Sequence, residues 1–215
     1  MRMLEQIDAI NRRHPWSHND FYSPWILRQA AQGPRYSALD IGCGSGNLVA
    51  GLRACFEHVT GIEPDHLMAR TAQSRFETAE EITIRQCDFD TLDWKQQFDA
   101  ITLVAVLHHL PLDESLSKLK LLLRPGGRLV VIGCYREATL TDRLLSMIAL
   151  ITNPLFGVVK HWPIAAHPPV EMMAPTVMPR EMFAEIRRSV KLQLPGGRIR
   201  RRLFWRYSLV YTKPA

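Results

Sequence analysis

Short apolar runs of Val, Ile and Leu alternate along this chain with longer segments whose apolar residues recur at helical spacing. Such alternation is typical of a parallel β-sheet whose strands are joined by crossover helices. The clearest strand, Ala100–Leu107 (AITLVAVL), is apolar at successive positions, as expected where helices cover both faces of a sheet. The pattern therefore predicts a doubly wound α/β fold.

Seven strands follow from this pattern, and the short link between the last two indicates an antiparallel hairpin beside a mostly parallel sheet. Pro125-Gly126 marks the turn into the fifth strand. The predicted strands are Ala38–Ile41, His58–Ile62, Ile82–Cys87, Ala100–Leu107, Arg128–Gly133, Lys191–Leu194 and Phe204–Thr212. The predicted helices cover Asn47–Phe56, His66–Phe76, Glu114–Leu123 and Pro179–Arg188.

The connection after Cys134 breaks this rhythm. Residues 136–178 are helical at first and then irregular, and so long a connection is typical of a lid or a disordered segment. Its apolar run, Leu144–Val159, is interrupted by a proline and is shorter than the roughly 20 residues of a membrane-spanning helix, so no membrane span is expected. The methionines of Val170–Met178 suit a lid over apolar ligands, although packing against the domain or a second subunit explains them equally. We therefore expect one domain, monomeric or homodimeric, with a leader (1–35), a core (36–135), a lid insertion (136–178) and a final helix with hairpin (179–215).

Composition indicates the class of protein and its cellular location but does not identify the activity. The chain has 215 residues, of which 47% are hydrophobic and 22% charged, as in an ordinary globular domain. Its four cysteines form no C-x-x-C pair, so neither a zinc site nor a disulfide framework is expected, and we recognise no secretory signal. These features favour a cytoplasmic location. The net charge of +6 is densest in Gly197–Arg202 (GRIRRR), which we interpret as a solvated turn.

The segment LDIGCGSG, residues 39–46, carries the strongest chemical signal. It follows the first predicted strand and precedes a helix, so Gly42, Gly44 and Gly46 lie in a strand-to-helix turn. Such a turn lets a ligand lie against bare main chain close to a helix N-terminus. The three missing side chains therefore predict a cofactor site.

Two acidic residues specify the cofactor. Glu63 ends the second strand, where a carboxylate can accept hydrogen bonds from both hydroxyls of a ribose. Asp40 precedes the glycines, where it would repel a phosphate and attract an ammonium, and Asn47 replaces the third glycine of the dinucleotide fingerprint. We therefore expect an adenosine-type cofactor with a positive charge, and the pattern disfavours a nicotinamide-dependent oxidoreductase.

Five segments, in order, resemble those of the seven-stranded, class I (Rossmann-like) S-adenosylmethionine-dependent methyltransferases, including uncharacterised small bacterial members. They are ALDIGCGSG, GIEPD, CDFD, FDAITLVAVLHHL and LLRPGGRLVV. The resemblance implies S-adenosyl-L-methionine as the cofactor. By position it implies Asp40, Gly42, Cys43, Gly44 and Gly46 at the methionine end, Glu63 at the ribose, Asp88 at the adenine amino group, Phe89 and Pro64 or Asp65 along the adenine ring, and the backbone of Val104 and Ala105 near the sulfonium.

Candidate catalytic residues lie after the fourth strand. Methyl transfer from a sulfonium needs no acid for the leaving group, but an oxygen or nitrogen nucleophile can need a base. His108 and His109 stand at the carboxyl edge of the sheet, where ligands bind in such folds, although a helix cap and packing explain them as well. In the leader, Tyr22 or Trp25 is a candidate for cation–π contact with the sulfonium. No metal site is expected, because no carboxylate or cysteine stands at ligand spacing from the histidines.

The sequence thus predicts methyl transfer to an O, N or C atom of a small, partly hydrophobic acceptor. Two alternatives stay open: an RNA methyltransferase that uses the basic run Gly197–Arg202, and a protein that binds S-adenosylmethionine without catalysis. Nucleic acid is the less favoured partner, because the fourth strand leads into AVLHHL and not into the Asn/Asp-Pro-Pro-aromatic motif of enzymes that methylate base amines.

Overall fold

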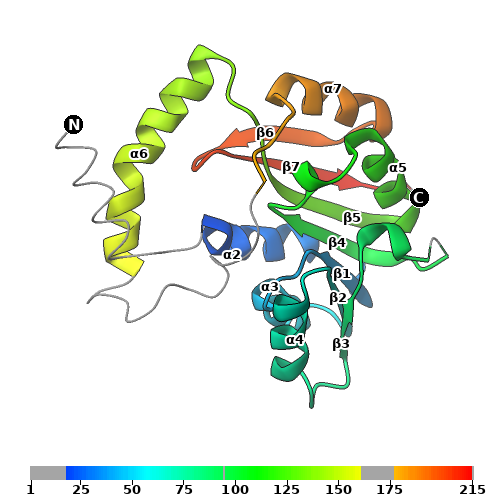
Figure 1. Ribbon diagram of the computed structural model, residues 1–215. Helices are drawn as coiled ribbons and strands as arrows, with labels where there is room; N and C mark the ends of the chain where they lie inside the picture. Colours follow the sequence, from blue (N-terminus) through cyan, green and yellow to red (C-terminus); the bar gives the residue numbers. More distant parts are fainter. Residues whose placement is uncertain (1–17, 94, 161–176, 215) are drawn as a thin grey trace.

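The computed structural model describes residues 18–93, 95–160 and 177–214, and its centre is a seven-stranded sheet (Figure 1). The strand order is β3-β2-β1-β4-β5-β7-β6; β7 runs antiparallel to both β5 and β6, and the other neighbouring strands are parallel. The strands are β1 Ser37–Ile41, β2 His58–Glu63, β3 Ile82–Gln86, β4 Phe98–Val104, β5 Leu123–Cys134, β6 Arg198–Arg202 and β7 Arg206–Thr212. The predicted doubly wound sheet with an antiparallel end is confirmed.

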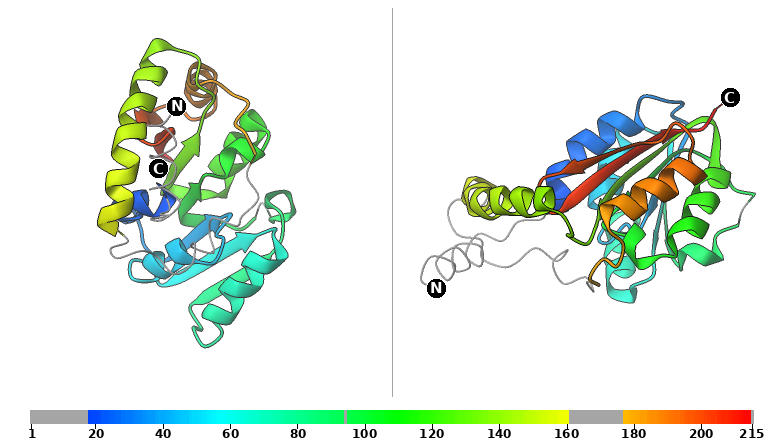
Figure 2. Two further views of the ribbon diagram at one scale, coloured as in Figure 1. Left: turned by 60° about the vertical axis from the view of Figure 1, so that its left-hand side comes forward. Right: turned by 90° about the horizontal axis from the view of Figure 1, so that it is seen from above.

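Helices cover both faces of the sheet, as the views along different directions show (Figures 1 and 2). The α-helices are α2 His18–Ala30, α3 Asn47–Arg53, α4 His66–Arg75, α5 Leu112–Leu122, α6 Leu140–Lys160 and α7 Phe183–Gln193, and two 3-10 turns are η1 Phe89–Thr91 and η2 Leu107–His109. Leu129 and Val131 pack in one core with α5 and α7, whereas Val130 and Ile132 pack in a second core with α2 and α3. Alternate residues of one strand thus enter opposite cores, which explains the continuous apolar runs.

The fourth strand ends earlier than predicted. β4 stops at Val104, so the prediction that it continues to Leu107 is wrong. Ala105 takes a left-handed conformation with φ of 56°, which turns the chain out of the sheet, and η2 begins at Leu107. This early exit places the residues after β4 at the carboxyl edge of the parallel strands.

Two predictions near the C-terminus are also wrong. Lys191–Leu194 is not a strand, because α7 continues to Gln193 and buries Phe183, Ile186 and Val190 on one helical face. The basic run is not a solvated turn, because Arg198–Arg202 forms β6 and pairs along its length with β7. A strand at the edge of the sheet tolerates charged side chains, which discourage pairing with another chain.

The helical start of the insertion is confirmed as α6, which stands beside the sheet and away from its faces (Figure 2). Asp142 near its first turn is 2% exposed and accepts a hydrogen bond of 2.8 Å from Arg201 Nε of β6. Further along, Ala149 packs with Phe204 of the β6–β7 hairpin. Across the described helices, α6 included, no stretch is long and apolar enough to cross a bilayer. The parts of the leader and of the methionine-rich segment at 1–17 and 161–176 lie outside the described residues.

Candidate functional site

The loop of three glycines joins β1 to α3 and lies against the ends of two neighbouring strands. The N–H groups of Gly42 and Cys43 both donate to the carbonyl oxygen of Ile62, at 2.9 and 3.0 Å. A Cβ at Gly42 would lie 2.3 Å from Val106 Cγ2, and a Cβ at Gly46 would lie 2.5 Å from the ring of Phe76. Both glycines also have positive φ, 68° and 85°. Packing within the protein therefore requires glycine at both positions. The prediction that their side chains are absent only to admit a ligand was incomplete.

Gly44 differs from its two neighbours. Its φ is 53°, and a Cβ built on it would meet no protein atom within 4 Å. Its N–H donates to Glu63 Oε2 at 2.9 Å. The open space beside this residue lets a ligand reach the main chain, which is the geometry that the sequence predicted for the whole loop.

Asp40 lies under this loop as a buried carboxylate, 2% exposed. Thr102 Oγ1 donates to its Oδ1 at 2.6 Å, and no cationic side chain in the described part of the chain forms an ion pair with it. Burial raises the pKa of Asp40 to about 7; the hydrogen bond from Thr102 opposes this increase, and the charge of Glu63 adds a smaller one. An ammonium group close to Asp40 would supply the missing counter-charge.

Glu63 connects two loops at the carboxyl edge of the sheet. It is 8% exposed, and its Oε1 accepts from the N–H of Asp65 at 3.0 Å while its Oε2 accepts from Gly44. Each oxygen of a carboxylate has two acceptor positions, so both retain capacity for a ligand hydroxyl. Asp40, Gly44 and Glu63 thus form one polar cluster, and their chemistry fits an amino-acid end and a ribose.

The remaining predicted cofactor contacts lie in two different settings. Asp88 and Pro64 are exposed at the same edge of the sheet. Phe89 is 5% exposed in the core, where Lys118 Nζ stands 4.4 Å from its ring centre and donates to its carbonyl. Tyr22 is 7% exposed on α2 and donates its hydroxyl to the carbonyl of Leu203 at 2.8 Å. The cofactor contacts of these four residues stay predictions.

The end of β4 carries backbone strain and the two histidines. Ala105, with its positive φ, donates its N–H to Ile132 O at 2.7 Å, and such strained non-glycine residues concentrate at functional sites. In η2, the rings of His108 and His109 have centroids 4.2 Å apart. His108 Nδ1 is buried and has no hydrogen-bond partner among the described residues.

The His108 ring is uncharged at neutral pH. Burial, followed by the charges of His109 and Arg206, lowers the pKa of His108 to about 4, and a backbone hydrogen bond at Val177 only partly opposes this. A buried polar atom without a partner is uncommon in folded proteins and calls for an explanation. A ligand that forms a hydrogen bond with His108 Nδ1 would explain the unpaired atom.

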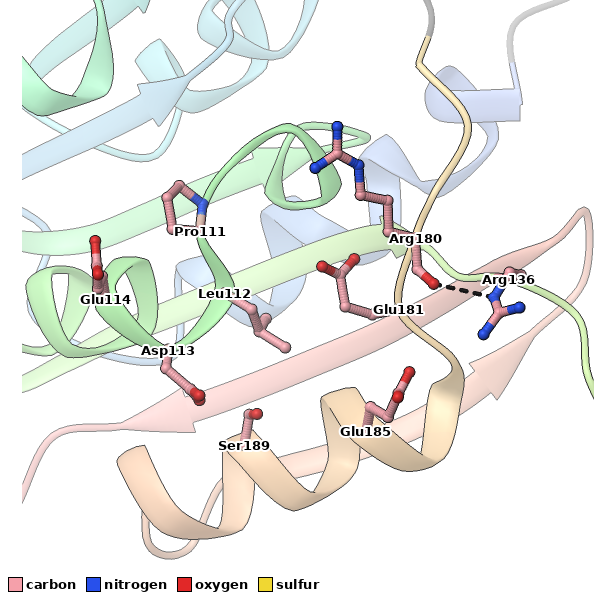
Figure 3. Close-up of a pocket in the computed structure, with 9 residues that line it drawn as sticks. All are labelled: Pro111, Leu112, Asp113, Glu114, Arg136, Arg180, Glu181, Glu185 and Ser189. Atoms are coloured by element: carbon pink, nitrogen blue, oxygen red, sulfur yellow. Dashed lines mark hydrogen bonds between the residues drawn. The ribbon is translucent and has the colours of Figure 1, made fainter.

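Two adjoining cavities extend from the histidines. One, of about 400 Å³, is lined by His108, His109, Leu110, Pro111, Val177, Arg180 and Glu181. The next, of about 560 Å³, shares Pro111, Arg180 and Glu181 and reaches α7. Figure 3 shows the carboxyl group of Glu181 on the side of Leu112, whereas Glu185 Oε2 accepts from the N–H of Met182 at the start of α7, at 2.7 Å. Sequence reasoning missed Arg180 and Glu181, since they belong to no motif and reach the site only through the packing of the segment before α7.

Comparisons with known proteins point to methyltransferases. A family model described as a methyltransferase domain matches residues 39–131. An uncharacterised methyltransferase of Mycobacterium tuberculosis is 30% identical over 203 residues, which cover 93% of this chain and 98% of the relative. Among solved structures, the PH0226 protein of Pyrococcus horikoshii aligns with a TM-score of 0.63 at 16% identity, over 90% of this chain and 88% of the other. Magnesium protoporphyrin IX methyltransferase of Synechocystis, with bound S-adenosylmethionine, aligns with a TM-score of 0.54 at 17% identity, over 99% of this chain and 85% of the other.

Proposed function

The chain belongs to the class I S-adenosylmethionine-dependent methyltransferases and uses S-adenosylmethionine as its cofactor, and we propose that it methylates an O, N or C atom of a small, partly hydrophobic acceptor bound beside His108. The observation that carries this proposal is the buried Nδ1 of His108, which finds no hydrogen-bond partner in the described part of the chain and lies at a cavity of about 400 Å³. The lining combines apolar Leu110, Pro111 and Val177 with polar groups, as in most small-molecule sites.

The three polar residues at the glycine loop support the assignment of the cofactor contacts. Asp40 would pair with the ammonium of the methionine end, the main chain at Gly44 would approach that end closely, and Glu63 would accept from the ribose hydroxyls. When bound, S-adenosylmethionine supplies a methyl group on a sulfonium, which is a strong electrophile without any protein acid.

The protein's contribution would then be chiefly positioning. Holding two reactants in line can lower a barrier by roughly 7–11 kcal/mol. Because its ring is neutral, His108 can accept a hydrogen bond from a hydroxyl or amine of the acceptor and orient a lone pair toward the methyl group. His109 is the second candidate for this contact, on the exposed side of the pair.

Transfer of an isotope-labelled methyl group tests the proposal. The protein would be incubated with methyl-deuterated S-adenosylmethionine and, separately, with small-molecule and nucleic-acid fractions of a bacterial extract, and the products analysed by mass spectrometry. We expect label in the small-molecule fraction, a loss of at least tenfold with His108→Gln, and unchanged affinity of that variant for S-adenosylhomocysteine. Label in nucleic acid alone would refute the small acceptor. Cofactor binding without label in any fraction would favour a non-catalytic binding protein.

A further inference from the structure

Two arginines of the C-terminal hairpin face each other across the last two strands. Arg202 of β6 is the direct cross-strand partner of Arg206 of β7, so their side chains emerge on the same face of the sheet. On that face they reach α2, where the Arg202 guanidinium lies 4.9 Å from the ring centre of Trp25. Like charges placed directly opposite in an antiparallel pair destabilise it. The hairpin keeps this pair despite that cost.

Among the side chains that the structure describes, no ion pair joins either arginine to a carboxylate. Arg206 donates only to neutral oxygens, from Nη1 to Phe204 O and from Nη2 to Asn19 Oδ1, both at 3.3 Å. Its Nε is buried and finds no hydrogen-bond partner in residues 18–93, 95–160 and 177–214 as far as their side chains are described. Arg202 donates from Nε to Ser208 Oγ at 2.9 Å. By contrast, Arg201, which precedes Arg202 on β6, points to the other face and pairs with Asp142 at 2.8 Å.

This pair stands at the same edge of the sheet as the candidate acceptor site. Arg206 is paired in register with Cys134, the last residue of β5, and β5 is the parallel neighbour of β4, which leads to His108. The charge of Arg206 reaches His108 and Tyr22, and that of Arg202 also reaches Tyr22. The positive charge of Arg206, which has no ion pair among the described side chains, therefore acts on His108.

We propose that Arg206, assisted by Arg202, binds an anionic group of the methyl acceptor, a carboxylate or a phosphate, which makes the acceptor an organic anion. This inference rests on the proposed function for the location of the acceptor. A planar guanidinium binds both kinds of oxyanion through two parallel hydrogen bonds, and the free Nε–H of Arg206 is one of the donors that such a fork uses. The bound anion would also remove the repulsion between the two cross-strand arginines.

Nuclear magnetic resonance of the arginine Nε–Hε groups tests the proposal directly. The protein, saturated with S-adenosylhomocysteine, would be titrated with inorganic phosphate and separately with acetate at constant ionic strength. We expect a saturable shift of the Arg206 Nε–Hε signal. With Arg206→Gln, followed through the backbone amides of His108 and Tyr207, the dissociation constant should rise at least tenfold, equivalent to about 1.4 kcal/mol. Arg200→Gln is the matched control, because Arg200 is an exposed arginine of the same hairpin, on β6, and it should change the constant less than twofold.

Each result has a defined meaning. Saturation by phosphate alone supports an acceptor with a phosphate ester, and saturation by acetate alone supports an acceptor with a carboxylate. Saturation by both anions supports a site that binds either kind of oxyanion. The proposal is overturned if neither anion gives a saturable shift, or if Arg200→Gln weakens anion binding as much as Arg206→Gln does. If the protein still binds S-adenosylhomocysteine in that case, the proposed function is unaffected. Failure to bind S-adenosylhomocysteine would instead count against the proposed function. If Arg206→Gln does not fold, as judged by circular dichroism, Arg206→Lys keeps the charge without the fork and should still weaken binding.

Discussion

Substitution of Gly44 by alanine separates the backbone role of the glycine loop from its role at the cofactor. A Cβ at this position meets no protein atom within 4 Å, so the methyl group causes no clash. The φ of 53° remains unfavourable for alanine by roughly 1–2 kcal/mol. Reduced freedom of the unfolded chain offsets about 0.4–1 kcal/mol of that strain. We therefore expect a net loss of about 1 kcal/mol in the free energy of unfolding.

Gly196 provides the matched control for Gly44→Ala. It has a φ of 89°, and a Cβ there also meets nothing within 4 Å, but it lies in the turn between α7 and β6. Urea unfolding should give similar losses of stability for Gly44→Ala and Gly196→Ala. Calorimetric titration with S-adenosylhomocysteine should show at least tenfold weaker binding for Gly44→Ala alone, because its methyl group occupies the space beside the loop. Equal affinities of the two variants would refute the placement of the cofactor against Gly44.

Three further predictions concern titration and anchoring. Because the pKa of Asp40 is raised to about 7, part of the Asp40 population is protonated at pH 6.5, and binding of the cofactor ammonium should release that proton. Calorimetric titrations in buffers of different ionisation enthalpy should detect the proton release, and Asp40→Asn should abolish it. His108 has a folded-state pKa of about 4 against an ordinary 6.5, so the unfolded chain binds more protons between these values and stability should fall as the pH is lowered from 6.5 to 4. His108→Gln should flatten this part of the plot of unfolding free energy against pH, measured by urea unfolding. If the plots of the variant and the wild type ran parallel, the lowered pKa of His108 would be contradicted. Asp142→Asn should lower the free energy of unfolding by roughly 1.5–3 kcal/mol, because Asp142 is 2% exposed and bonds to Arg201 and Thr139; the exposed Asp90→Asn serves as control.

Much of the fold was predictable because local pattern and tertiary structure agree. Runs such as the one in β4 enter two cores at once, so their apolar character reports directly on the layers that cover them. The glycine loop and Glu63 were also predictable, since a strand-to-helix turn and the end of the next parallel strand must meet at one edge of the sheet.

The errors occurred where tertiary contacts decide the local conformation. Ala105 leaves the sheet although its neighbours are apolar and suit a strand. Arg198–Arg202 is a strand because β7 supplies hydrogen-bond partners, and its charge conceals this in the sequence. Nothing in the sequence pointed to Arg206 as a site residue, because that proposal depends on its Nε, which has no hydrogen-bond partner among the described residues, and not on any motif.

The two hydrogen bonds that Glu63 accepts from main-chain N–H groups affect how ligand binding should depend on temperature. They fix the orientation of the carboxylate before any nucleoside arrives, so about 1.5–2 kcal/mol of glutamate rotamer entropy is lost when the chain folds and not when the ligand docks. The same bonds fasten the loop after β1 to the loop after β2. Warming that loosens either loop would therefore weaken the proposed hydrogen bonds between Glu63 and a ribose well before the strands themselves separate.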